Sequence, residues 1–389
     1  MENKVKILID ASGIVNKTTG VGQYSLQLLK ALSKIDDKNE YFIVLQQTLK
    51  DTHPIYNLRN KSNFYLIKGN TPSVGPKKQF YYYKLLRRNC FKFDLLHSLN
   101  SELPLYCNIK TIVTIHDLKY IKYPQFFINF SKIKLQYLKY IIKKGVEKAD
   151  KIITVSQSTK NDIINLFGIN QDKITVIYEA SNLELYSNNK LYNVDISNNN
   201  ILEKFFIKKP YLLYVGEKRP HKNLKGLIQA FALFKHKYDR WNTYLVITGK
   251  KYSSYNEYIY EAEKLKIMDS LIFTEFVPDE YLKVVYSEAE ALLLISFYEG
   301  FGIPILEAME CGTPVITSNI SSMPEVAGDA AILVNPYNIA EITESINRIM
   351  SSKILKKQLI EKGVKRVNQF SWEMAIKKTL EIYNEKYLN

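Results

Sequence analysis

The stretch Ala291–Pro314, ALLLISFYEGFGIPILEAMECGTP, decides how the rest of the chain is interpreted. It opens with five apolar residues, the length of a strand that is buried on both faces of a parallel sheet. Pro304 suits the first turn of a helix, because its φ is fixed and no N–H is needed there. Gly312 and Pro314 end that helix. The stretch therefore predicts a buried strand, a glycine-rich loop and a short helix.

Two carboxylates flank the glycine-rich loop. Glu299 precedes Gly300, Phe301 and Gly302, and Glu307 lies on the predicted helix. Free N–H groups at a helix N-terminus bind phosphate, and glycines let a ligand approach the backbone closely. Carboxylates on both sides of the loop could accept hydrogen bonds from hydroxyls at the two ends of a sugar nucleotide. The spacing alone fits equally well two solvated glutamates in any α/β protein.

The chain of 389 residues indicates two domains of ordinary size. Apolar runs of strand length alternate with helical patterns, as in doubly wound parallel sheets. A segment rich in Asn, Ser and Leu from Asn182 to about Asn200 has no clear period, and the strand–helix pattern begins again at Tyr211. We predict an N-terminal Rossmann-like domain over residues 1–185, a linker over 186–209, a second Rossmann-like domain over 210–370 and a C-terminal helix over 371–389.

Cysteine usage and hydropathy favour an intracellular protein. Cys90, Cys107 and Cys311 are scattered and form no CxxC pair, so we interpret them as reduced thiols rather than disulfides or zinc ligands. No apolar run approaches the ~18–20 residues that span a bilayer. The N-terminus leads directly into a predicted strand and lacks the form of a signal peptide. We expect a cytoplasmic protein.

The net charge of +15 is unevenly distributed along the chain. Residues 1–209 carry 32 Lys and Arg against 17 Asp and Glu, whereas residues 210–389 carry 22 of each sign. Two segments, 61–93 and 118–146, contain eight and seven basic residues among many aromatic ones and no acidic residue. Basic residues among aromatic ones suit an anionic membrane surface. We expect peripheral binding to the inner face of the plasma membrane, through a patch that includes Lys77, Lys78, Arg87 and Arg88.

Two alternatives to a membrane surface stay open for this charge. The chain is rich in Lys, Asn, Ile and Tyr throughout, as an AT-rich genome would give. Nucleic acid is also a polyanion, but no DNA- or RNA-binding signature accompanies the basic residues, so we expect no nucleic-acid partner.

The first half contains a glycine loop and a histidine at the ends of predicted strands. Gly20 and Gly22 follow the first strand and precede a helix, but the third glycine of a dinucleotide-binding fingerprint is missing. His116 and Asp117 directly follow the buried strand 111–115. Ligands of open α/β sheets bind beyond the carboxyl ends of the strands, so His116 is a candidate site residue. A lone histidine after a strand is more often a capping or core residue.

A basic loop follows the first strand of the second domain. Lys218, Arg219 and Lys222 lie between that strand and the next helix. Cations at this position could neutralise a diphosphate leaving group, on which charge builds as a glycosidic bond breaks. A solvated basic loop is the alternative.

Several motifs together resemble the retaining glycosyltransferases of family 4, which have the two-domain GT-B fold. The resemblance rests on the glycine loop, TIHDL, YVGEKRPHKNL, the segment from Glu299 to Glu307 and its continuation SSMPEVAGDAAILVNP, and FSWEMA, in the order found in the family. It implies an α/β protein in which two Rossmann-like domains face a cleft and the C-terminal helix returns to the first domain.

The resemblance also implies roles for individual residues. Glu307 would bind the donor ribose, and Glu299 and His116 would contact the donor sugar near the reacting centre. The backbone of the loop at Gly300, Phe301 and Gly302 would hold the phosphates and the sugar, and Val277 lies in the loop that reads the nucleobase. Gly20 and Gly22 would face the donor, and Lys222 would bind the diphosphate.

The chain departs from the family pattern at three places. Glu217 stands where the family arginine often follows the glycine, so that role passes to Arg219, with Lys218 as the competitor. Gln23 differs from the usual glycine loop, and Tyr178-Glu179-Ala180 replaces an Asn-Gly-type turn. No Asp-x-Asp pair is present, which fits an enzyme without a metal or other cofactor.

We therefore expect a retaining, metal-independent hexosyltransferase that builds surface polysaccharide or lipopolysaccharide. Its substrates would be a nucleotide sugar, with GDP-mannose the first choice, and a lipid-linked or saccharide acceptor. A sugar-nucleotide 2-epimerase on the same fold and an inactive membrane-associated scaffold are the alternatives.

Overall fold

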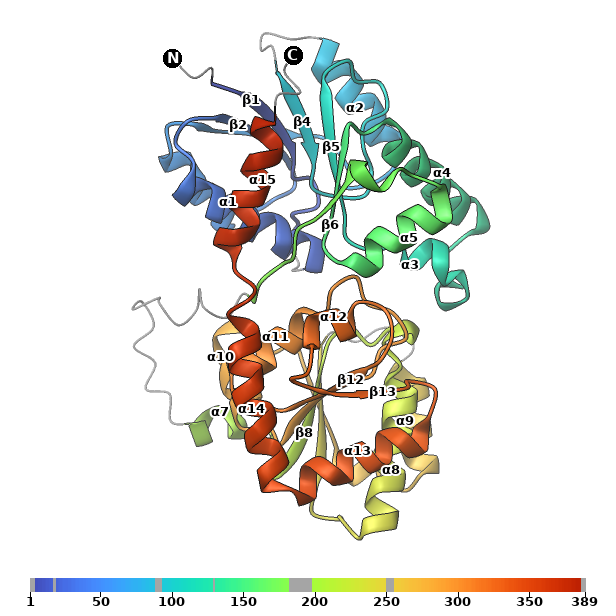
Figure 1. The fold of residues 1–389 in the computed structure, drawn as a ribbon. Helices are drawn as coiled ribbons and strands as arrows, with labels where there is room; N and C mark the ends of the chain where they lie inside the picture. Colours follow the sequence, from blue (N-terminus) through green and yellow to red (C-terminus); the bar gives the residue numbers. More distant parts are fainter. Residues whose placement is uncertain are drawn as a thin grey trace. The chain divides into compact units, whose positions relative to one another are not determined.

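The chain forms two compact units, each built around one parallel sheet (Figure 1). The computed structural model describes residues 4–16, 19–87, 93–128, 130–181, 198–249 and 255–385, with residues 198–200 described for the backbone only. The first unit comprises residues 1–179 and 371–389, and the second comprises 180–370. The predicted α/β class with two doubly wound domains is confirmed.

The first unit contains a seven-stranded sheet with the order β3-β2-β1-β4-β5-β6-β7. Its strands are buried apolar runs, as the sequence predicts for strands covered on both faces. They are β1 (Lys6–Asp10), β2 (Glu40–Gln46), β3 (Phe64–Gly69), β4 (Leu95–Ser98), β5 (Lys110–Ile115), β6 (Lys151–Thr154) and β7 (Ile174–Val176).

Helices cover both faces of this sheet (Figure 1). Ser131 and Ser156 cap two of them, each accepting a hydrogen bond from the backbone three residues later. The α-helices are α1 (Gly20–Ile35), α2 (Pro76–Arg87), α3 (Lys119–Lys122), α4 (Lys132–Lys148), α5 (Gln157–Phe167) and α15 (Trp372–Asn384), and the 3₁₀ turns are η1 (Pro54–Asn60), η2 (Pro124–Phe127) and η3 (Gln171–Lys173).

The second unit contains a six-stranded sheet with the order β10-β9-β8-β11-β12-β13. Its strands are β8 (Tyr211–Val215), β9 (Tyr244–Thr248), β10 (Leu271–Glu275), β11 (Ala291–Leu294), β12 (Val315–Ser318) and β13 (Ile332–Val334). Its helices are α7 (Asn198–Lys204), α8 (Leu224–Tyr238), α9 (Tyr255–Lys264), α10 (Asp279–Ser287), α11 (Ile303–Glu310), α12 (Met323–Ala327), α13 (Ile339–Ser351) and α14 (Lys353–Val367), with 3₁₀ turns η4 (Pro220–Lys222) and η5 (Met268–Ser270).

Each sheet has one point at which the strand order reverses. In the first unit this switch point lies between β1 and β4, and in the second it lies between β8 and β11. Open α/β sheets bind ligands in the crevice outside the carboxyl ends of the two strands that flank such a point. The topology therefore marks the loops after β1, β4, β8 and β11 as the places to search for a site.

The C-terminal helix α15 belongs to the first unit, in which it packs beside α1 (Figure 1). The Tyr383 hydroxyl lies 2.6 Å from Nδ1 of the buried His97 on β4, and Nε2 of His97 lies 2.8 Å from Thr114 Oγ1. Burial, and then the neighbouring His116, lower the pKa of His97 to about 3, so this imidazole is neutral. The helix is thus fixed by a polar contact as well as by its apolar face.

The region predicted as a linker is partly helical. Residues 198–204 form α7, which contacts α10 of the second unit, and Ile201 and Leu202 are buried. The expectation of irregular structure up to residue 209 is wrong there, because this short segment gains its stability from packing rather than from a visible helical period. Residues 182–197 lie outside the described part of the chain. Among the described helices, none is both long and apolar enough to cross a membrane.

Candidate active site

The two loops that flank the switch point of the second sheet are joined by an ion pair. Lys222 follows β8 at the end of η4, and Glu299 follows β11. Nζ of Lys222 donates to Oε1 and Oε2 of Glu299 at 2.7 and 2.6 Å. The sequence separation of 77 residues hides this contact, but the topology places the two loops next to each other. Two of the predicted site residues therefore do come together.

Glu299 is further fixed by neighbouring serines. Ser296 Oγ donates to Glu299 Oε1 at 2.6 Å. Ser321 and Ser322, which precede α12, donate through their hydroxyls to the carbonyl oxygen of Glu299 at 2.7 and 3.0 Å. Ser322 also donates to the Phe301 carbonyl at 2.8 Å. The loop is thus held from two directions, so its carboxylate and backbone are preorganised for a ligand.

Gly302 supplies the backbone conformation that connects this loop to α11. Its φ of 109° lies in the region that favours glycine, and a Cβ there would stand 3.2 Å from Ile305 Cδ1. The helix begins at the next residue, with Pro304 in its first turn, as the sequence predicts. The glycine therefore allows a buried strand to turn directly into a helix whose first N–H groups follow the loop.

Glu307 is buried inside α11 next to a tyrosine. Tyr286 of α10 donates its hydroxyl proton to Glu307 Oε2 at 2.7 Å, and the glutamate is 9% exposed. Burial raises the pKa of Glu307 to about 7, with smaller raising effects of Asp279 and Glu310, while the Tyr286 hydrogen bond opposes the rise. This carboxyl can therefore change protonation near neutral pH when hydroxyl groups reach it.

The three cations of the loop after β8 have different environments. Lys218 is fully buried, and its ammonium donates to the Gly249 carbonyl oxygen, so it does not face a ligand. Arg219 keeps 24% of its side chain exposed, and its Nε lies 2.7 Å from Glu217 Oε2. The structure thus disfavours Lys218 as the diphosphate-binding cation and leaves Arg219 and Lys222 for this predicted role.

Val277 lies in the loop between β10 and α10. Its side chain is 4% exposed, whereas that of Phe276 is 50% exposed. A role of this residue in reading a base would therefore depend on the backbone, as predicted, and it stays a prediction.

The glycine loop of the first unit leads into the start of α1. Thr19 caps the helix by accepting a hydrogen bond from the Gly22 backbone at 3.1 Å. A Cβ at Gly22 would stand 3.2 Å from the Gly13 carbonyl oxygen, whereas Gly20 is open, with no atom near a Cβ position. Gly22 is therefore required by local packing, and Gly20 leaves the helix N-terminus accessible.

His116 follows β5 and is held through both ring nitrogens. Nε2 lies 3.0 Å from the Leu99 carbonyl oxygen, which can only accept, so Nε2 carries a proton. Nδ1 lies 3.4 Å from Glu179 Oε1, and the Tyr24 ring packs edge-on at a centroid distance of 4.6 Å. The predicted contact of His116 with a donor sugar stays a prediction, and it requires one of these contacts to be exchanged.

Only part of the predicted basic patch lies at the surface. Lys77 and Arg87 of α2 are exposed, whereas Arg88 lies outside the described residues. Lys78 is fully buried, with its Nζ 2.6 Å from Asp10 Oδ2, so its assignment to the patch is wrong. Its position on α2 points it toward the sheet, and a carboxylate at the end of β1 compensates the buried charge.

Sequence reasoning missed several residues of these sites. Ser296 and Tyr286 fix the two glutamates, and Glu179 pairs with the candidate histidine. Only Glu179 carried a signal, because it departs from the resembled pattern. Across the described part of the chain, no three His, Cys, Asp or Glu side chains are grouped so that they could hold a metal ion.

Comparison with known proteins identifies both units. The family model for glycosyltransferase family 4 matches residues 18–185, and the model for glycosyl transferases group 1 matches residues 198–366. O-antigen chain mannosyltransferase B of Escherichia coli is 28% identical over 97% of this chain and 99% of its own length. O-antigen chain mannosyltransferase RfbU of Salmonella typhimurium is 28% identical over 88% of this chain and 93% of its own length.

A solved structure supports the same architecture. Sucrose-phosphate synthase from Thermosynechococcus elongatus aligns over 99% of this chain and 100% of its own, with a TM-score of 0.76 and 21% identity. This similarity concerns the fold alone.

Proposed function

Because the chain belongs to the glycosyltransferases, with a family 4 and a group 1 region, we propose that it is a retaining hexosyltransferase of surface glycan synthesis. The donor proposed first is GDP-mannose, and the acceptor is a saccharide or lipid-linked saccharide. Two relatives that match over most of their length are named O-antigen mannosyltransferases, which supports this choice.

The Lys222–Glu299 pair at the switch point of the second sheet is the observation that carries the proposal. It places a cation and a carboxylate beside the glycine loop that leads into α11. In this proposal the carboxylate accepts hydrogen bonds from the donor sugar, and Lys222, with Arg219, neutralises the diphosphate as the glycosidic bond breaks. Glu307 accepts hydrogen bonds from the ribose hydroxyls.

The proposed reaction needs no metal and no further cofactor. The acceptor oxygen forms a bond with the anomeric carbon while the bond from that carbon to the phosphate oxygen breaks. The electron pair stays on the leaving nucleoside diphosphate, whose phosphate oxygen takes the acceptor proton. Attack and departure on the same face retain the anomeric configuration. Cations fixed before the reaction stabilise the leaving group more than the intact donor.

A donor screen with matched lysine variants tests the proposal. Purified protein is incubated with GDP-, UDP- and dTDP-sugars and glycoside acceptors, and nucleotide release and product are measured. We expect Lys222→Ala to lower kcat/KM by about 10²–10³-fold, as for loss of a group that stabilises developing charge. The control Lys225→Ala, on a lysine whose side chain is 61% exposed, should leave kcat/KM unchanged. Near wild-type turnover by Lys222→Ala, or epimerised sugar from donor alone, would contradict the proposal.

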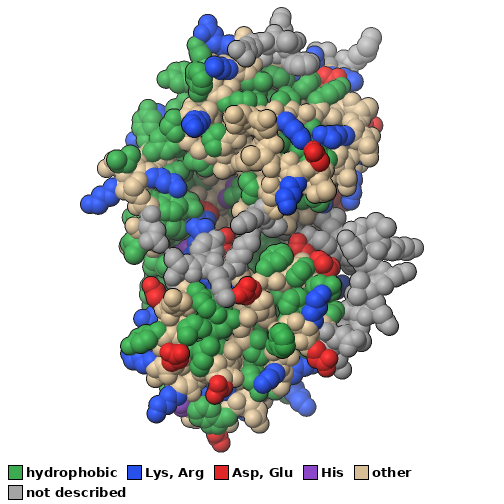
Figure 2. All heavy atoms as spheres, turned by 180° about the vertical axis from the view of Figure 1, so that it is seen from behind, with side chains coloured by type: hydrophobic (Ala, Val, Ile, Leu, Met, Phe, Trp, Pro, Cys, Tyr) green, Lys and Arg blue, Asp and Glu red, His purple; other side chains and the backbone are tan. Residues whose placement is uncertain are grey.

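We also propose that the first unit binds an anionic membrane surface. Phe80, Tyr106, Ile128, Ile133 and Tyr140 are large apolar side chains that are more than half exposed. Exposed cations on α2 and α4 surround them: Lys77, Lys84, Arg87, Lys132, Lys134 and Lys139. The two helices are neighbours, because Glu102 accepts hydrogen bonds from both Gln79 and Tyr137. We call these eleven exposed side chains the basic-aromatic surface; the upper part of Figure 2 shows basic side chains interspersed with hydrophobic ones.

A further inference from the structure

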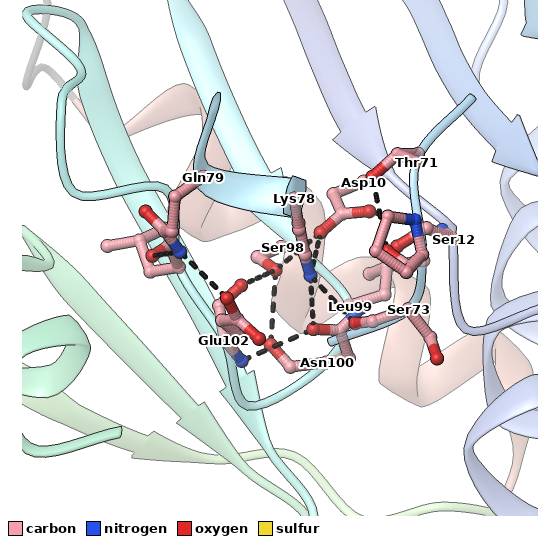
Figure 3. Close-up of polar contacts among 12 residues, drawn as sticks. Asp10, Ser12, Thr71, Ser73, Lys78, Gln79, Ser98, Leu99, Asn100 and Glu102 are labelled. Carbon is pink, nitrogen blue, oxygen red and sulfur yellow. Dashed lines mark hydrogen bonds and ion pairs between the residues drawn. The ribbon is translucent and has the colours of Figure 1, made fainter. Parts of the chain in front are cut away.

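A buried polar cluster occupies the switch point of the first sheet (Figure 3). Asp10 and Ser98 end the neighbouring strands β1 and β4, pair in register, and are joined by a hydrogen bond from Ser98 Oγ to Asp10 Oδ2 at 3.1 Å. Lys78 of α2 lies against them with its ammonium 2.6 Å from Asp10 Oδ2. This is the position at which the topology predicts a ligand, and it corresponds to that of Lys222 and Glu299 in the second sheet.

The cluster fixes the orientation of Asn100, two residues after β4 (Figure 3). Its side chain lies 2.7 Å from Lys78 Nζ and 3.2 Å from the Glu102 backbone nitrogen. Both neighbours are donors, so the atom between them must be the carbonyl oxygen Oδ1. The amide nitrogen Nδ2, with two N–H groups, is therefore turned away from Lys78 and cannot flip without losing two hydrogen bonds.

Within the described part of the chain, Nδ2 of Asn100 has no hydrogen-bond acceptor, although the residue is only 8% exposed. A buried donor without an acceptor costs about 1–3 kcal/mol. The side chain is aimed toward the loop after β1, because a Cβ at Gly13 would stand 3.9 Å from Nδ2. A glycine at this position leaves room above the amide. Nδ2 therefore has both the need and the space for an external acceptor.

The charges around Asn100 favour a neutral acceptor atom. Burial alone would raise the pKa of Asp10, but the Lys78 ammonium holds it below its usual value, so the two groups form a neutralised pair. Glu102 is also buried, and it accepts hydrogen bonds from the neutral groups Gly75 N, Gln79 Nε2 and Tyr137 OH. An anionic ligand would meet no uncompensated cation in this cluster.

We propose that the Asn100 amide binds a hydroxyl oxygen of the acceptor saccharide and that the buried Lys78–Asp10 pair acts as the positioning device for this amide. The inference rests on the proposed glycosyltransferase function, and it adds a binding residue for the acceptor. Such a pair contributes little net stability, since removing two charges from water offsets their attraction. Its effect is to hold Oδ1 and so to commit both N–H groups to the ligand.

The test uses Asn100→Asp, which keeps an oxygen for Lys78 and Glu102 but replaces the donor by an acceptor. The control is Asn108→Asp, the same change at an exposed position of the same unit. Octyl α-D-mannopyranoside and its monodeoxy analogues serve as acceptors, with the donor found in the screen. Circular dichroism verifies that each variant is folded, and Asn100→Ser provides a second variant without the added charge.

We expect Asn100→Asp to raise the acceptor KM by about tenfold or more, the effect of one lost hydrogen bond, with donor KM and donor hydrolysis unchanged. One monodeoxy analogue should bind the wild type about tenfold less tightly and Asn100→Asp no less tightly than the parent glycoside. An unchanged acceptor KM in both variants, a parallel loss of donor affinity, or no glycoside binding by an active wild type would overturn the inference. A wild type without nucleotide release would instead refute the proposed function.

Discussion

Glu307 is the residue whose protonation should respond to the donor. The free protein holds this carboxyl at a pKa of about 7, because it is buried beside Tyr286. Ribose hydroxyls donate hydrogen bonds that only the ionised form accepts through both oxygens. Donor binding should therefore favour the carboxylate and release a proton.

The first prediction concerns donor affinity and pH. Affinity should increase from pH 5.5 to pH 7.5, and calorimetry in buffers of different ionisation enthalpy should detect proton release near pH 6–7, given a pKa of about 7 in the free protein. Glu307→Gln should bind the donor about tenfold or more weakly and release no proton. A pH-independent donor affinity in the wild type would contradict the role of Glu307.

The same group predicts the pH dependence of stability. Its pKa is raised in the folded protein from 4.5 to about 7, so the folded state binds the proton more tightly than the unfolded state. The resulting stabilisation is full below pH 4.5 and is lost as pH rises through 7. The free energy of unfolding, measured in urea, should therefore fall less between pH 5 and pH 8 in Glu307→Gln than in the wild type. Equal falls would indicate that the carboxyl is solvated.

At the residue scale, sequence reasoning identified charged side chains more easily than their partners. The role of Lys78 could not be inferred because Asp10 lies 68 positions earlier and approaches it only when β1 and α2 pack together. Glu179 and His116 are likewise 63 residues apart. Glu299 and Glu307 were identifiable because a local pattern, a buried strand followed by glycines and a helix, contains both.

Among the elements, α15 is the one that a single hydrogen bond tests most directly. Tyr383 is fixed to His97, which the low pKa of about 3 keeps neutral, and α15 packs beside α1. Most strands and helices followed from apolar runs and helical periods within a few residues. The helix α7 was missed, because its sequence NNNILEK is short and has few apolar positions.

The prediction for this element is that Tyr383→Phe lowers the free energy of unfolding by about 1–3 kcal/mol, since Nδ1 of the buried His97 loses its partner. Chemical denaturation measures the change. Tyr260→Phe, the same substitution at a side chain that is 68% exposed, is the control and should have almost no effect. If both variants unfold at the same denaturant concentration as the wild type, the contact does not fix the helix.

For the whole molecule, the most distinctive property is the uneven charge. The excess of +15 lies within residues 1–209, and the described part of it includes the basic-aromatic surface. Each Lys or Arg near an anionic membrane contributes about 1 kcal/mol, and salt screens the attraction. Exposed aromatic and aliphatic side chains add an apolar contribution that salt does not remove.

The corresponding prediction uses sedimentation with phosphatidylglycerol-containing vesicles. Replacing Lys77, Lys84 and Arg87 by Ser should weaken binding by more than about tenfold at low salt. The control replaces Lys353, Lys357 and Lys365, exposed lysines of α14 in the second unit, and should retain binding. Equal losses in both triple variants would mean that total charge, rather than this surface, causes the binding.

The return of the last helix to the first unit has a consequence for biosynthesis. When a ribosome has completed residues 1–179, the nascent unit still lacks α15, which is translated only after the whole second unit. Until then Ile376, Ile382 and Tyr383 are absent, and the groups that they cover, including His97, stay exposed. A premature stop codon shortly after Phe370 should therefore leave a finished second unit joined to a permanently unfinished first one.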